Sequence, residues 1–79
     1  MQENKPNILI VDDERGLRIG TQRLLEEEGY DVTTAENGYE GITLGTSCNF
    51  DVVIIDMKMP DIDGLDVLSA IKKVFPNTV

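Results

Sequence analysis

The sequence predicts an α/β fold, a parallel sheet with helices on both faces and elements in the order β-α-β-α-β-α. Two short apolar runs, at residues 7–11 and 51–56, have the composition of strands that are buried on both faces. Segments with helical spacing of apolar residues separate the strands, as is typical of parallel sheets. The chain has 79 residues, which allows one small domain at most.

The three predicted strands differ in polarity. Residues 7–11 and 51–56 are rich in β-branched apolar side chains, and each run is closed by aspartate. Residues 31–35 are half polar, which suits an edge strand. The two apolar strands should therefore lie together, in the spatial order second, first, third.

The first predicted helix covers residues 14–28 and ends before Gly29, a favourable stop. Its spacing places four side chains on one face: Leu17, Thr21, Leu24 and Leu25. The second helix, residues 38–47, gives a weaker pattern because it contains two interior glycines. The third helix, residues 64–74, has Asp63 as a cap and two lysines in its last turn.

This topology brings three carboxylates together. Right-handed crossovers make the first and third strands neighbours, with their C-terminal ends side by side. Ligands bind at that end of open α/β sheets, where the strand order reverses. Asp12, Asp13 and Asp56 are therefore predicted to share one pocket. Each also has an ordinary role open to it, as a helix cap for the acidic pair or a turn residue for Asp56.

Clustered carboxylates repel each other unless a cation neutralises them. Mg²⁺ prefers oxygen ligands, and a chain without histidine and with one cysteine, Cys48, offers an oxygen-only site. Mg²⁺ beside a strand-end aspartate also shields the charge of an approaching phosphate, so that the aspartate can attack phosphorus and form an aspartyl phosphate. Residues 61–64 superficially suggest a calcium loop, but the glycine falls at the fourth position instead of the sixth.

Composition excludes several function classes. A net charge of −8 repels nucleic-acid phosphates, so no nucleic-acid binding is expected. The absence of histidine removes Ser-His and Cys-His catalysis. No apolar run approaches the roughly 20 residues of a membrane span, and residues 1–7 carry no signal-peptide core. A single cysteine forms no internal disulfide, and we expect a cytoplasmic protein without membrane contact.

Three segments resemble the receiver domains of response regulators, the CheY-like family of two-component signalling. Residues 8–14, Ile-Leu-Ile-Val-Asp-Asp-Glu, look like that family's first strand and acidic pair. Residues 56–64, Asp-Met-Lys-Met-Pro-Asp-Ile-Asp-Gly, look like its phospho-acceptor loop, and residues 35–40 match the turn after its second strand. The resemblance runs from Lys5 onward and implies a flavodoxin-like (CheY-like) fold.

The resemblance also implies roles. Asp56 would accept a phosphoryl group from a sensor histidine kinase or phosphotransfer protein, in a signalling module that is not an enzyme. Asp13 and Asp56 would ligate Mg²⁺ directly, Asp12 mainly through water, and Lys58 through its backbone carbonyl. The first helix and the strand-to-helix loops would dock the kinase, and transcription is the expected output of the full-length protein.

Residues 1–79 depart from the family by length. The resemblance implies an incomplete receiver that lacks the fourth and fifth strands and helices, the switch Ser or Thr, and the active-site Lys. Lys72, Lys73 and Thr78 do not fit those positions, and residues 77–79 would begin a fourth strand. Phosphorylation should therefore be slow, without propagation of a switch.

The third strand is apolar on both faces, yet no later strand covers its outer edge, so we expect self-association there or an unstable monomer. The alternative function is a Mg²⁺-dependent phosphohydrolase with an aspartate nucleophile. Such enzymes usually place an acid/base aspartate two residues after the nucleophile, where this chain has Lys58 after Asp56.

Overall fold

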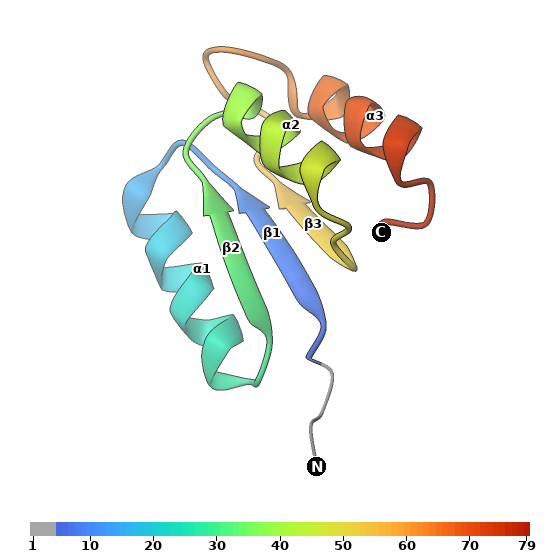
Figure 1. Cartoon of the computed structure of the whole chain (residues 1–79). Helices are drawn as coiled ribbons and strands as arrows, with labels where there is room; N and C mark the ends of the chain where they lie inside the picture. Colours follow the sequence, from blue (N-terminus) through green and yellow to red (C-terminus); the bar gives the residue numbers. More distant parts are fainter. Residues whose placement is uncertain (1–4) are drawn as a thin grey trace.

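The computed structural model describes residues 5–79 and shows a three-stranded parallel sheet with three helices (Figure 1). The elements follow the predicted order: β1 (Asn7–Val11), α1 (Arg15–Glu27), β2 (Asp31–Ala35), α2 (Gly38–Ser47), β3 (Val52–Ile55) and α3 (Gly64–Val74). The strand order is β2-β1-β3, as the polarity of the strands predicts. The flavodoxin-like fold class is confirmed for these three strands and three helices.

The register aligns the C-terminal ends of the strands at one edge of the sheet. Val11, the last residue of β1, pairs with Ala35 of β2 and with Ile55 of β3. All three arrows in Figure 1 point toward that edge. The segments that follow β1 and β3 therefore begin next to each other.

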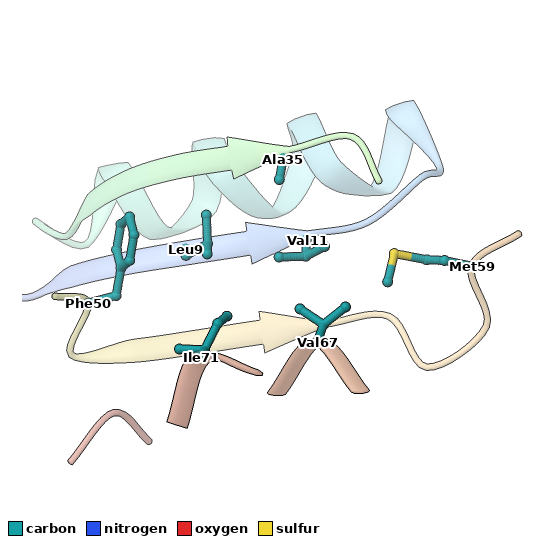
Figure 2. Packing of buried hydrophobic residues seen from close by; sticks show 7 residues of the cluster. All are labelled: Leu9, Val11, Ala35, Phe50, Met59, Val67 and Ile71. Carbon is teal, nitrogen blue, oxygen red and sulfur yellow. The ribbon is translucent and has the colours of Figure 1, made fainter. Parts of the chain in front are cut away.

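The main core lies between the sheet and the α2–α3 pair. Alternate residues of a strand face opposite sides, so Leu9 and Val11 point toward this layer and Ile8 and Ile10 toward α1. Figure 2 shows the buried hydrophobic cluster, which comprises Leu9, Val11, Ala35, Phe50, Met59, Val67 and Ile71. Leu9, Val11, Val67 and Ile71 are fully shielded from solvent.

The glycines that weaken the helical pattern of α2 let this helix approach its neighbours closely. A Cβ at Gly41 would lie 2.8 Å from both Cγ atoms of Val11. A Cβ at Gly45 would overlap the side chain of Ile71. Both glycines are buried. The same two residues that lower the helix propensity of α2 therefore allow it to pack closely against β1 and α3.

Helix α1 differs from expectation in the face it buries. Leu17 and Leu24, which the helical spacing places on one apolar face, are 62% and 66% exposed, whereas Arg18 is 9% exposed. The helix packs mainly over β2, so its inner side carries Arg18 and Leu25. Leu17 instead lines an open hollow together with Ile54 of β3, and Leu24 is left exposed.

The outer edge of β3 is also less open than expected. The N–H of Val79 donates to the carbonyl oxygen of Asp51 (3.1 Å), and the N–H of Val53 donates to the carbonyl oxygen of Val79 (2.9 Å). This pattern is that of a parallel pair between Val79 and Val52. The prediction that nothing covers this edge is therefore wrong at its first residues, because the chain folds back after α3 and Val79 begins the pairing expected of a fourth strand.

The helix ends follow local rules, with one correction. Gly29 has a φ of 95° and ends α1, and the Asp63 side chain caps α3 by accepting the N–H of Leu65. The N-cap of α1 is Glu14, whose side chain accepts the N–H of Leu17, and not the acidic pair before it. Among the described residues, no helix is long and apolar enough to cross a membrane.

Candidate metal centre

The three predicted carboxylates meet at the C-terminal edge of the sheet. Asp12 and Asp13 follow β1 directly, and Asp56 follows β3. One carboxylate oxygen from each lies within 4.8 Å of one from each of the others. The convergence that the strand order predicts is confirmed, from positions more than forty residues apart in the sequence.

Local hydrogen bonds orient two of these side chains. Asp12 Oδ1 accepts the N–H of Glu14 at 2.9 Å, and Asp56 Oδ1 accepts the N–H of Lys58 at 3.1 Å. Both carboxylates are half-buried, while that of Asp13 is exposed. Within residues 5–79 these bonds use one oxygen of Asp12 and one of Asp56, which leaves the second oxygen of each for a ligand.

The loop from Asp56 to Asp63 turns back tightly onto its own start. The carbonyl oxygen of Asp56 would lie 2.8 Å from a Cβ at Gly64, so only glycine allows this approach. Met59, midway along the loop, is buried in the core, and Pro60 is exposed. The close return and the buried methionine fix both ends of the short segment that carries Lys58.

The acidic pocket forms the polar end of a hollow of about 530 Å³ on the α1 side of the sheet. Its apolar walls come from Leu17 of α1, Ile10 of β1 and Ile54 of β3. Ile54 is 41% exposed, in agreement with a shallow, open hollow. The carboxylates therefore lie at the solvent-accessible mouth of the hollow.

Two residues that the sequence patterns do not single out hold this region together. The Arg18 guanidinium donates to the backbone carbonyl oxygen of Asp12 at 2.9 Å and so ties α1 to the β1–α1 turn. Asp61 accepts hydrogen bonds from the backbone N–H groups of Gly38 and Tyr39. Burial raises the pKa of Asp61, but hydrogen bonds from the backbone N–H groups of Tyr39, Gly38, Asp61 and Ile62 together outweigh it, and the pKa lies below its ordinary value.

The donor set fits a hard divalent cation. All three groups are carboxylates, the sequence has no histidine, and Cys48 is exposed at the far end of α2. Oxygen-only sites with room for water suit Mg²⁺, which keeps several waters when it binds proteins. The N–H of Lys58 is engaged with Asp56, while the part of its carbonyl in metal binding stays a prediction.

A parallel sheet of order β2-β1-β3 with an acidic cluster at its C-terminal edge defines the class of CheY-like α/β domains. Residues 8–79 match the model of the family described as response regulator receiver domain. The chain belongs to this family.

Relatives support the assignment in sequence and in structure. The transcriptional regulatory protein ResD of Bacillus subtilis is 40% identical over 72 residues, which are 91% of this chain and 30% of ResD. Sporulation initiation phosphotransferase F of the same bacterium is 39% identical over 70 residues, 89% of this chain and 56% of that protein. Such relatives are considerably longer than the chain.

Solved receiver structures superpose closely. Response regulator TrrA of Thermotoga maritima, in complex with Mg²⁺ and BeF, has a TM-score of 0.81 and 47% identity, covering 86% of this chain and 59% of its own. Chemotaxis response regulator CheY4 of Vibrio cholerae has a TM-score of 0.89 and 30% identity, and the match covers 95% of this chain and 64% of the CheY4 chain. The chain thus spans about three-fifths of these receivers.

Proposed function

We propose that this chain is the phospho-acceptor part of a two-component response regulator, with Asp56 as the residue that takes the phosphoryl group. The observation that carries the proposal is the meeting of Asp12, Asp13 and Asp56 at the ends of two adjacent strands. The family match and the Mg²⁺–BeF complex of the relative TrrA support it.

The reaction is a transfer onto a carboxylate. An oxygen of Asp56 attacks the phosphorus of a phosphohistidine, the P–N bond breaks, and the imidazole nitrogen leaves as the acyl phosphate forms. Bound Mg²⁺ would neutralise charge on the phosphoryl oxygens. Asp13 and Asp56 would hold the ion directly, Asp12 through water, and Lys58 through its backbone carbonyl.

We propose a sensor histidine kinase or phosphotransfer protein as the partner, reached through α1 and the loops at the acidic edge. Such partners present their phosphohistidine in the cytoplasm, where we also place this chain. The names of relatives such as ResD favour control of transcription as the output of the full-length protein. The strongly acidic composition argues against nucleic-acid binding by residues 1–79 themselves.

We further propose that residues 1–79 are part of a longer receiver, in view of the share of the solved receivers that they cover. In isolation they would associate through the outer edge of β3, beyond the point where Val79 pairs. Alternate peptide groups of a parallel strand face opposite neighbours. Since Val53 donates outward to Val79, the peptide groups of Ile55 also face outward.

The test of the function is direct. The chain is incubated with Mg²⁺ and acetyl phosphate, and its intact mass is measured by mass spectrometry. We expect the mass of one added phosphoryl group. This addition should be absent in Asp56→Asn and absent when the metal is chelated. Stable stoichiometric labelling supports a signalling acceptor and not an enzyme of metabolism. Multiple turnover of a generic phosphatase substrate would instead support the phosphohydrolase alternative, which the family match does not favour.

A further inference from the structure

The loop between β3 and α3 is hydrogen-bonded to the N-terminal end of α2. Oδ1 of Asp61 accepts the N–H of Gly38 at 3.1 Å, and its Oδ2 accepts the N–H of Tyr39 at 3.0 Å. Gly38 and Tyr39 are the first two residues of α2. In Figure 1 the orange loop after β3 arches past this end of the helix.

The local cap of α2 leaves these two donors open. The Asn37 side chain accepts the N–H of Glu40 at 2.8 Å, and the Asn37 carbonyl oxygen accepts the N–H of Gly41 at 3.0 Å. The earlier N–H groups of a helix have no partner within it. Asp61 supplies both missing acceptors from a distant part of the chain, and its negative charge suits the positive end of the helix dipole.

Packing reinforces these hydrogen bonds. A Cβ at Gly38 would overlap the side chain of Ile62 and would lie 3.2 Å from a methyl carbon of Val67. The Ile62 side chain therefore packs directly against the backbone of α2 at Gly38. We call the contact of Asp61 and Ile62 with Gly38 and Tyr39 the α2 latch.

Asp61 of the α2 latch lies only five positions after Asp56, on the loop that also carries Lys58. Between them, Met59 is 8% exposed and anchored in the core. We infer that Asp61 is a positioning residue: by holding the first turn of α2, it fixes the path of residues 57–60 and with it the geometry around Asp56. The metal-binding consequence rests on the proposed function, whereas the effect on the loop does not.

The test compares three variants of residues 1–79. Asp61→Ala removes both acceptors, Asp61→Asn removes the charge and keeps one acceptor oxygen, and Asn37→Ala removes a cap of the same helix without touching the loop. Amide NMR spectra without metal are the first readout. We expect Asp61→Ala to shift the amides of Gly38 and Tyr39 upfield and those of Met57 and Lys58 as well, with smaller shifts in Asp61→Asn.

The matched control separates positioning from helix stability. Asn37→Ala should leave the amides of Met57 and Lys58 in place, although it weakens α2. Equal loop shifts in Asn37→Ala and Asp61→Ala would overturn the inference, as would unchanged loop amides in Asp61→Ala. Equal effects of Asp61→Asn and Asp61→Ala would assign the role to charge alone and would also overturn it.

Mg²⁺ affinity is the second readout. Loss of an outer partner of a metal site typically weakens binding by 10- to 100-fold, so we expect about a tenfold higher Kd in Asp61→Ala, an intermediate value in Asp61→Asn and an unchanged value in Asn37→Ala. An unchanged Kd in Asp61→Ala would overturn the metal-binding consequence. If the unsubstituted chain bound no Mg²⁺ at all, the proposed function would fail, while the amide shifts would still decide the positioning role.

Discussion

The side chain of Arg18 reaches back along α1 and donates a hydrogen bond to the carbonyl oxygen of Asp12, 2.9 Å away. The bond joins the one buried charged side chain of α1 to the residue that follows β1. Since Asp12 belongs to the acidic cluster, the position of α1 and the shape of the pocket mouth depend on each other. A change in the position of α1 would therefore be felt at the acidic cluster.

Arg18→Met should destabilise the chain by about 2 kcal/mol, because a hydrogen bond from a charged donor is lost while the aliphatic packing is retained. Thermal unfolding monitored by circular dichroism measures the change. Arg15→Met is the matched control, since Arg15 is exposed in the first turn of the same helix. Equal losses in the two variants would contradict a special role for Arg18.

Glycine substitutions in two helices should have opposite effects. Gly41→Ala places a Cβ 2.8 Å from the side chain of Val11, and we expect a loss of about 1–3 kcal/mol from overpacking. Gly20→Ala on α1 has no atom within 4 Å of its new Cβ and should stabilise the chain by roughly 0.5–1 kcal/mol. Denaturant unfolding compares them, and a neutral Gly41→Ala would argue against the close approach of α2 to β1.

The strand order and the acidic pocket could be predicted because they depend on strand polarity and on topology rules that act along the whole chain. The exposure of Leu17 could not, because helical spacing reveals an apolar face but not the element that covers it. The grip of Asp61 on Gly38 also has no local signal, since the two residues are 23 positions apart. The pattern of residues 61–64 does predict a turn and a cap, and the cap at Asp63 is confirmed.

The effect of Asp13→Asn on the unfolding temperature should change sign when Mg²⁺ is added. Without a divalent cation, Asp13→Asn relieves repulsion among the three carboxylates and should raise the unfolding temperature. With Mg²⁺ at 100 times its Kd, binding stabilises the unsubstituted chain by about 2.7 kcal/mol, and Asp13→Asn should lose most of this gain. Asp66→Asn, on the exposed start of α3, should respond equally in both conditions. Parallel behaviour of the two variants would contradict a metal site at Asp13.

The contribution of the Asp61 carboxylate to folding stability should decrease as the pH falls. Burial raises its pKa in the folded chain, but the backbone N–H groups of Tyr39, Gly38, Asp61 and Ile62 together lower it by more. A lowered folded pKa gives stability that is fully present above the unfolded value, 3.8, and is lost as the pH falls through the folded value. Asp61→Asn should therefore unfold at a lower temperature than the unsubstituted chain at pH 7, and the gap should narrow in acid. A gap that is constant from pH 7 down to pH 2.5 would contradict ionisation of Asp61 as its source.

Association through β3 should respond to charge at its exposed edge. Ile54 is 41% exposed beside the outward-facing peptide groups of β3, and a lysine at the edge of a sheet opposes pairing with another chain. We expect the mass measured by light scattering to rise with protein concentration in the unsubstituted chain and to stay near that of the monomer in Ile54→Lys. Leu65→Lys is the control, because Leu65 is 59% exposed on helix α3 and is not part of the sheet. A cooperatively unfolding monomer at every concentration would show that the pairing of Val79 with Val52 is enough to protect the strand.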